Sequence, residues 1–470
     1  MNLGIFLLFS FFLFSCSQNE VTKVSGKKED GLKQMTFSWT KKSESDWTKE
    51  YGFKKQDVGF ILFDPQKKKV LKSAEANQAF TPASVMKILT ANYTLWKYPP
   101  DHRFVTTIKS DGELKGDVFT GDLYLVGGGD PLLMSNHLME LCVNLRTKIK
   151  TLKGNFYFDE SLFTPQLAIE NSQADEDSYN APLSPLSSDF NLFQFHYRYN
   201  TSDNSLEYFY FPDGGQKFSL ARSRDGGSWD ALDLDHTQWL VPMLKGSGKE
   251  NLPLRQAGLA TAMKLQNFCG KLGLILPSPI AKITPDKAPI WSHHRSIPLT
   301  EIITLGMEYS NNLVFESLLL YTSGKSTLSE AASSMANFYK EKIKVIEESK
   351  IQMVNGSGLS HENKLSPHYL LEVLKLWGDE ALSFMPISGV KGTLGHRLFE
   401  PPMSMSTWAK TGTMDYVSSL AGTLFTKKGK KLQFVIMVNN KSNLTFSKDT
   451  FKDKAKKLQD DLVELWWHEN

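Results

Sequence analysis

The chain has 470 residues, of which 41% are hydrophobic and 22% are charged, and its formal net charge at pH 7 is +3. These values are ordinary for a soluble globular protein, and the length allows a large core and two or more domains. A charge this close to balance argues neither for nor against nucleic-acid binding. We expect no nucleic-acid partner.

The first 16 residues have the pattern of an export signal. Residues 3–14 form an almost unbroken apolar run that is too short to span a bilayer. The run closes on Leu13-Phe14-Ser15-Cys16, which resembles a bacterial lipobox, although no Lys or Arg precedes it. We expect a lipoprotein signal peptide over residues 1–16, acylation of Cys16, and a lipid anchor at the periplasmic face of a bacterial membrane. The alternative is an ordinary cleaved signal and a soluble periplasmic protein.

The next part of the chain combines a tether with the first elements of a domain. Residues 17–35 are polar and rich in Lys, Glu and Gly, which predicts a flexible tether. In the following part, 36–103, the run 58–63 and a strand from Val70 predict a β-hairpin. A helix that holds Ser84 follows and should end before Pro99-Pro100.

The pattern changes between residues 104 and 251, and we predict an inserted β-rich region of one or more domains there. Gly127-Gly128-Gly129-Asp130-Pro131 has no Lys-Ser/Thr after it, so it indicates a structural turn rather than a phosphate loop. The strands that we expect in this region are short and separated by turns: 105–108, 121–126, 155–158 and 206–211.

Helical periodicity returns in the last part of the chain, 252–470. The predicted helices there cover residues 255–272, 299–321, 328–343, 367–377 and 452–467, and the predicted strands cover 405–413, 418–426 and 431–439. Together with the first hairpin, these elements predict one α/β (α+β) domain with an antiparallel sheet and a helical cluster, split by the insert.

The two cysteines that follow the signal lie far apart, in apolar, helix-like runs. A disulfide between Cys142 and Cys269 is one alternative in an oxidising compartment, but we expect two separately buried thiols. No Cys or His spacing is typical of a metal site, because His293-His294 has no partner at helical spacing. We therefore expect neither a metal nor a cofactor.

Ser84 and Lys87 are the first candidate catalytic residues. Three positions apart at a helix start, they lie on one face, and the positive end of the helix dipole favours an oxyanion there. A desolvated lysine has a lowered pKa and can take the proton of a serine hydroxyl. Two further stretches carry polar groups in apolar surroundings: Ser310-Asn311-Asn312 within the helix 299–321, and Lys410-Thr411-Gly412-Thr413 at the end of the strand 405–413.

In this order, Ser-x-x-Lys, Ser-x-Asn and Lys-Thr-Gly form a set that resembles the active-site motifs of penicillin-binding proteins and serine β-lactamases. The segment between Ser84 and Ser310 is far longer than in a β-lactamase. The chain therefore resembles the D-alanyl-D-alanine carboxypeptidase/endopeptidase family of low-molecular-weight, class C penicillin-binding proteins. Further stretches also look like that family: 123–131, 179–182, 355–360 and 389–394.

The resemblance implies a penicillin-binding, transpeptidase-like fold and a serine peptidase that acts on peptidoglycan peptides and is inhibited by β-lactams. It implies that Ser84 is the acylated nucleophile and that Lys87 is its base. Ser310, held by Lys410, would relay the proton to the leaving amine.

The resemblance also assigns substrate contacts. Asn312 would bind a peptide carbonyl of the substrate, and Thr411, Gly412 and Thr413 would line the site of its terminal carboxylate. The backbone N–H groups of Ser84 and Thr413 would form the oxyanion hole.

One position departs from the family. His361 stands where an Arg commonly contacts the carboxylate of the diaminopimelate side chain, which leaves side-chain recognition open. Two other functions remain as alternatives. A β-lactamase is disfavoured by the long insert and by the absence of a convincing deacylating Glu loop in the sequence. A non-catalytic lipoprotein that binds peptidoglycan or β-lactams would not need the complete set of motifs.

Overall fold

The structure is a computed structural model that describes residues 50–470 apart from 175, 224–226, 344–350, 401 and 441–445. The signal peptide, Cys16 and the tether of the sequence analysis lie outside the described residues. Within that description, no helix is long and apolar enough to cross a bilayer.

The first sheet pairs strands from the beginning and from the end of the described chain. Its five strands are all antiparallel, and β1 pairs with β19 so that Phe60 faces Ile436. The order in the sheet is β17 (Thr407–Met414), β18 (Val417–Phe425), β19 (Lys431–Asn439), β1 (Val58–Asp64) and β2 (Lys69–Ala74). The hairpin and the three late strands predicted from the sequence are confirmed.

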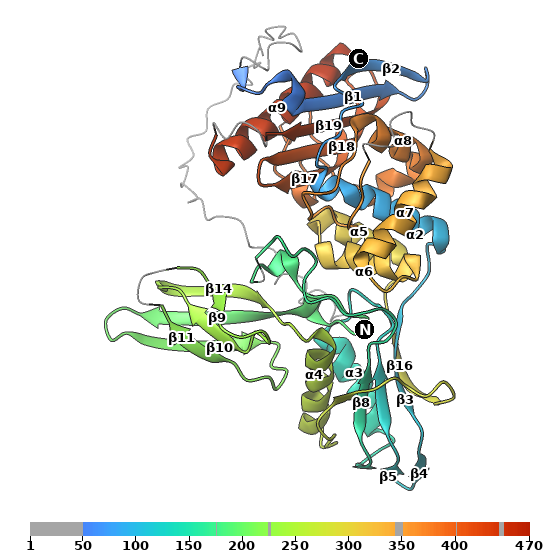
Figure 1. The fold of residues 1–470 in the computed structure, drawn as a ribbon, viewed down its shortest axis with the longest axis vertical. Coiled ribbons are helices and arrows are strands. Elements are labelled where there is room, and N and C mark those ends of the chain that lie inside the picture. The colour runs from blue at the N-terminus through green and yellow to red at the C-terminus, as the bar shows by residue number, and fades with distance from the viewer. Residues whose placement is uncertain (1–49, 175, 224–226, 344–350, 401, 441–445) are drawn as a thin grey trace, which may run out of the picture. The chain divides into compact units, whose positions relative to one another are not determined.

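Both faces of this sheet are covered, and for that reason β1 is apolar at almost every position. Phe60 and Leu62 pack with α9 (Lys448–Glu469) in one core cluster. Ile61 and Phe63 point the other way, into the cluster built by the remaining helices. Figure 1 shows α9 and α8 near this sheet, and both helices contact its strands.

The helical cluster carries Ser84, Lys87 and Asn312, and Ser310 lies between two of its helices. It consists of the 3₁₀ segment η3 (Ala83–Met86) and the helices α2 (Lys87–Lys97), α5 (Leu299–Tyr309), α6 (Asn312–Ser323), α7 (Leu328–Lys342) and α8 (Pro367–Trp377).

The predicted continuous helix 299–321 is wrong. Ser310 adopts the left-handed conformation with φ 55°, which ends α5, and the side chain of Asn311 then accepts the N–H of Val314 and caps α6. Ser and Asn compete for backbone hydrogen bonds, and they favour caps over helix interiors. The break places Ser310 and Asn312 at a junction between two helices.

A second five-stranded sheet takes three of its strands from the part of the chain predicted to be an insert. It is covered by α3 (Ser135–Arg146) and α4 (Ala257–Lys271), which pack against each other. The order of its strands is β15 (Ile280–Ala281), β8 (Phe156–Asp159), β6 (Leu123–Val126), β3 (Val105–Ser110) and β16 (Ile290–Arg295). The sheet thus joins strands from both sides of residue 251, where the sequence analysis placed the end of the insert.

Cys142 on α3 and Cys269 on α4 form a disulfide, so the expectation of two separate thiols is wrong. Each cysteine lies on the buried face of its helix, and the contact between α3 and α4 brings their Cα atoms to 5.1 Å. The sequence showed both apolar faces but not that the two faces meet.

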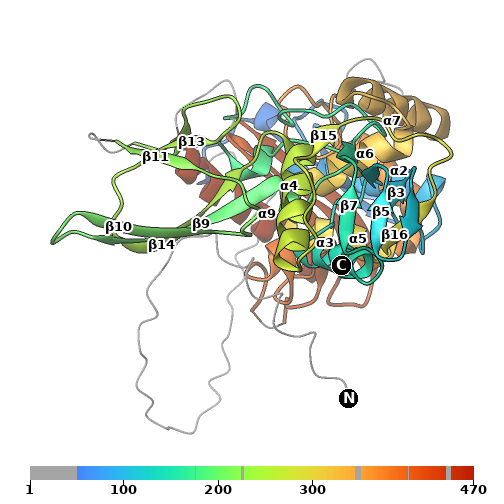
Figure 2. The ribbon, with the colours of Figure 1, turned by 90° about the horizontal axis from the view of Figure 1, so that it is seen from below.

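The rest of the inserted region forms three smaller sheets. Figure 2 shows β9, β10 and β14 side by side, and they pair in the order β10-β9-β14. The strands of these sheets are β9 (Leu192–Asn200), β10 (Ser205–Phe211), β14 (Gly246–Pro253), β11 (Ser219–Arg222), β12 (Asp230–Ala231), β13 (Gln238–Val241), β4 (Glu113–Lys115), β5 (Val118–Thr120) and β7 (Thr151–Lys153). The β-rich character predicted for this region agrees with these elements.

Candidate active site

Ser84 and Lys87 meet as the sequence predicted. Lys87 is fully buried, and its Nζ donates to Ser84 Oγ at 2.8 Å, to Asn312 Oδ1 at 2.7 Å and to the Ser357 carbonyl at 2.9 Å. The 3₁₀ turn of η3 stacks residues three apart directly over each other, which aligns the two side chains. A neutral amine in this position keeps two donors for Asn312 and Ser357 and turns its lone pair to the Ser84 hydroxyl.

The surroundings of Lys87 favour that neutral amine. Burial lowers its pKa well below the ordinary value, and the positive charge of Lys410 lowers it further. Glu316 acts in the opposite direction and raises the pKa. A lysine with a lowered pKa has the property that a general base near neutral pH requires.

Lys410 holds the second serine. Its Nζ donates to Ser310 Oγ at 2.9 Å and to the Thr411 carbonyl at 3.0 Å. Burial lowers the pKa of Lys410 to about 7. The neighbouring Thr411 hydroxyl donates to Thr393 Oγ1 at 2.7 Å, which ties β17 to the segment η8 (Gly392–Leu394).

Strand β17 runs directly past the nucleophile. A Cβ on Gly412 would lie 2.7 Å from the Pro82 carbonyl oxygen and 3.0 Å from the Ser84 nitrogen. Only glycine therefore allows the strand to come this close, and this packing explains the Gly of the Lys-Thr-Gly motif. The side chain of the next residue, Thr413, is exposed, as a group that meets a substrate would be.

Asn312 links the site to the inserted region. Its Oδ1 accepts from Lys87, and its Nδ2 donates to the Tyr179 carbonyl at 2.9 Å. Tyr179 lies in η4 (Ser178–Asn180), within a stretch that resembled the family but had no role assigned. Sequence reasoning also gave no role to Glu316 or Ser357. A carboxylate in the apolar run of α6 was the available signal for Glu316.

His361 lies close to the segment that precedes the nucleophile. Its carbonyl accepts from the Thr81 hydroxyl at 3.3 Å and from Lys364 Nζ at 2.8 Å. Asn439, at the end of β19, holds the backbone of Thr81 through both its N–H and its carbonyl. These contacts place His361 near the residues before Ser84, and its role toward a substrate stays a prediction.

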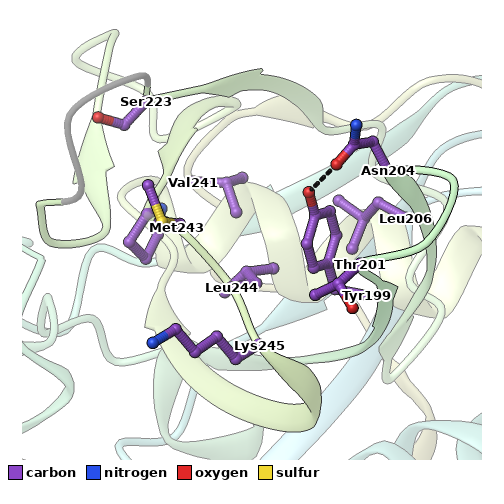
Figure 3. Close-up of a pocket in the computed structure, with 10 residues that line it drawn as sticks. Tyr199, Thr201, Asn204, Leu206, Ser223, Val241, Met243, Leu244 and Lys245 are labelled. Carbon is purple, nitrogen blue, oxygen red and sulfur yellow. Dashed lines mark hydrogen bonds between the residues drawn. The ribbon is translucent and has the colours of Figure 1, made fainter.

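A pocket of about 380 Å³ lies elsewhere in the inserted region and contains none of these residues. Figure 3 shows Tyr199, whose hydroxyl donates to Asn204, beside Leu206, with Val241, Met243 and Leu244 across from them. In the part of the chain that the structure describes, no group of three His, Cys, Asp or Glu side chains is arranged to hold a metal.

The D-Ala-D-Ala carboxypeptidase 3 (S13) family matches residues 45–207 and 262–462, which include every motif of this site. The chain belongs to this family. It is therefore a serine-type D-Ala-D-Ala carboxypeptidase/endopeptidase, and the resemblance noted in the sequence is confirmed.

Two relatives of this S13 peptidase match along most of their length. D-alanyl-D-alanine carboxypeptidase DacB of Haemophilus influenzae is 24% identical over 82% of this chain and 86% of its own. The D-alanyl-D-alanine carboxypeptidase of Actinomadura sp. (strain R39) is also 24% identical, over 82% of this chain and 78% of its own.

Solved structures confirm the penicillin-binding fold. Penicillin binding protein 4 of Haemophilus influenzae has a TM-score of 0.76 at 21% identity and covers 89% of this chain and 99% of its own. A predatory endopeptidase of Bdellovibrio bacteriovorus, solved with an immunity protein, has a TM-score of 0.53 at 17% identity and covers 88% and 94%.

Proposed function

We propose that this S13 peptidase cleaves D-Ala-D-Ala bonds, D-Ala cross-links, or both, in peptidoglycan stem peptides through an acyl-enzyme on Ser84. One observation carries the assignment of residues. The buried amine of Lys87 contacts Ser84 and Asn312 together, while Lys410 holds Ser310. The three motifs thus meet at one site. The nucleophile Ser84 is hydrogen-bonded to its base Lys87, and the proton relay Ser310 is hydrogen-bonded to Lys410.

In acylation, neutral Lys87 accepts the proton of Ser84 as Oγ attacks the carbonyl carbon of the penultimate D-Ala. The backbone N–H groups of Ser84 and Thr413 stabilise the oxyanion, and such a donor is typically worth about 3 kcal/mol. The proton that Lys87 accepted passes through Ser310 to the leaving amine as the peptide C–N bond breaks. Water then attacks the ester carbonyl: its hydroxyl joins the acyl carbon, the bond to Ser84 Oγ breaks, one proton of the water returns to Ser84 Oγ, and the shortened peptide leaves.

The substrate's carboxylate and amide have partners at the same edge. The ammonium of Lys410 and the hydroxyls of Thr411 and Thr413 bind the terminal carboxylate, and Gly412 lets this strand lie against Ser84. Asn312 binds a peptide carbonyl of the substrate through its amide. A β-lactam presents the same combination of a carbonyl and a carboxylate, so it is expected to acylate Ser84 and inhibit the enzyme.

We further propose a lipoprotein with an interrupted peptidase domain. Cys16 would carry the lipid anchor at the periplasmic face of a membrane, and residues 17–35 would form a tether. The inserted region would extend from residue 105 to residue 295, since β16 pairs with β3 and α4 shares the core cluster of α3.

Digestion of cross-linked muropeptides tests the activity. The purified protein and Ser84→Ala are incubated with dimeric and monomeric pentapeptides, and the products are read by mass. Loss of D-Ala indicates a carboxypeptidase, and monomers formed from dimers indicate an endopeptidase. If the wild type leaves both substrates intact, or if Ser84→Ala processes them equally well, the proposal is wrong.

A further inference from the structure

Glu316 is a fully buried carboxylate in an otherwise apolar stretch of α6. It lies one helical turn after Asn312, so the same face of α6 presents both residues. A buried charge is costly unless it is paired and hydrogen-bonded. Its partners therefore indicate why a carboxylate is present here.

Both oxygens of Glu316 accept backbone hydrogen bonds from one turn of the loop 355–360. Oε2 accepts the N–H of Gly356 at 2.8 Å, and Oε1 accepts the N–H of Ser357 at 2.7 Å. The carbonyl of that same Ser357 accepts Lys87 Nζ at 2.9 Å. The carboxylate thus fixes the residue whose carbonyl holds the catalytic amine.

Glu316 also provides a negative charge near the buried Lys87. Lys87 and Lys410 are both completely buried, and Lys87 is the charged group whose attraction acts on Glu316. The two N–H donors require an acceptor at each oxygen, so they favour the ionised form. Burial acts against that form and raises the pKa of Glu316.

We propose that Glu316 is a positioning residue of the acylation step, which orients the Ser357 carbonyl toward Lys87 and supplies a negative charge near that buried amine. This inference rests on the proposed function, because it assumes that Lys87 is the base for Ser84. Glu316 itself touches neither the substrate nor the reacting atoms.

The negative charge of Glu316 changes the pKa of Lys87 in a known direction. Glu316 raises the pKa of Lys87 against the effects of burial and of Lys410. Acylation requires neutral Lys87, so its rate rises with pH through this pKa. Removing the charge lowers the pKa, and the acidic limb of the rate profile then moves to lower pH. A nearby charge typically shifts a pKa by about 1–3 units.

The experiment measures the second-order rate constant of acylation by fluorescent penicillin from pH 4.5 to pH 9. Glu316→Gln should move the acidic limb down by about one pH unit or more. Its maximal rate should also fall, because an amide nitrogen replaces one of the two acceptors and releases the Ser357 turn. Glu160→Gln is the matched control: Glu160 lies in the inserted region, where it accepts from Ser184 Oγ at 2.7 Å, and its variant should keep the wild-type limb.

An acidic limb in Glu316→Gln that coincides with the wild-type limb overturns the inference, whatever the loss of rate. If Glu316→Gln does not fold, Glu316→Asp decides. Its carboxylate is set back by one methylene, so the limb should move in the same direction by less, and an unmoved limb overturns the inference. If penicillin fails to acylate Ser84 in the wild type, the proposed function itself is wrong, which is a separate outcome.

Discussion

Lys87 and Lys410 are both completely buried, yet their neighbours differ. The amine of Lys87 contacts a nucleophile, an amide oxygen and a backbone carbonyl, with Glu316 close behind. Lys410 contacts Ser310 and its own strand, and burial alone lowers its pKa. Lys87 is thereby suited to accept a proton, and Lys410 to remain charged toward a carboxylate in mildly acidic to neutral solution.

Removal of the base should stop acylation. Lys87→Ala is expected to lower the rate constant for acylation by penicillin by ~10²–10⁴-fold, the usual contribution of a general base. Thermal unfolding of the variant shows whether it is folded. A folded Lys87→Ala that is acylated at nearly the wild-type rate would mean that another residue takes the proton of Ser84.

The pKa of Lys410, lowered to about 7, predicts a basic limb of the pH profile. The ammonium form dominates below that value and is lost as the pH rises through it, so acylation should decline above about pH 7. Lys410→Arg keeps its charge at every accessible pH. The variant should be slower at its optimum, but its basic limb should move to higher pH.

The control for this prediction is Lys427→Arg, since Lys427 is exposed in the turn between β18 and β19. It should leave both limbs unchanged. A basic limb that is identical in the wild type and in Lys410→Arg would show that Lys410 does not titrate in this range.

The sequence predicted the contacts within each short motif, but not the contacts between distant segments that hold those motifs in place. Ser84 with Lys87, and Ser310 with Asn312, are fixed by short spacings, so their proximity was predictable. The contacts of Asn312 with Tyr179 and of Glu316 with Ser357 connect distant segments, and no periodicity reports them. The same holds for His361. The motif predicts that this residue lies near the cleft, but not which group its side chain contacts.

At the level of elements, the long helix predicted for 299–321 is the instructive error. The apolar periodicity continues across Ser310 and Asn311, so a pattern of hydrophobic residues alone predicts one helix. The left-handed conformation of Ser310 and the cap by Asn311 interrupt it. The other helices and the strands for which ranges were predicted had periodicities without such a conflict, and their positions agree with the structure within a few residues.

The disulfide between α3 and α4 should stabilise the inserted region. It closes a chain segment of 127 residues, and bonds that close long loops restrict the unfolded chain most. The double variant Cys142→Ala/Cys269→Ala should lose about 2–5 kcal/mol of unfolding free energy, measured by urea denaturation. Reduced wild-type protein should shift in the same direction. An unchanged unfolding midpoint in both samples would contradict this account.

At the scale of the whole molecule, the sequence predicted that the N-terminal hairpin and the last strands belong to one domain, and β1 pairs with β19 in a single sheet. The residue at which the inserted region ends was harder to predict from the sequence. Helix α4 and strand β16 look like ordinary elements in sequence, and it is their packing with α3 and β3 that supports the proposal that they belong to the inserted region. The order of elements along the chain does not report which sheet a late strand joins.

Membrane attachment is predicted from Cys16, which lies outside the described residues. The mature N-terminal peptide of the wild type should carry acyl chains, and the protein should fractionate with membranes, since two lipid signals give stable anchoring. Cys16→Ser should appear in the soluble fraction, whereas Ser17→Ala should behave as the wild type does. An unmodified Cys16 in the exported protein would refute the lipid anchor.

The central claim is that Ser84 is the nucleophile of a serine peptidase. The most direct measurement is the site of the covalent adduct formed with penicillin, read by mass spectrometry of peptides from the wild type and Ser84→Ala. The account predicts one adduct, on the peptide that contains Ser84, and no adduct in Ser84→Ala. An adduct on another residue, or undiminished labelling of Ser84→Ala, would contradict it.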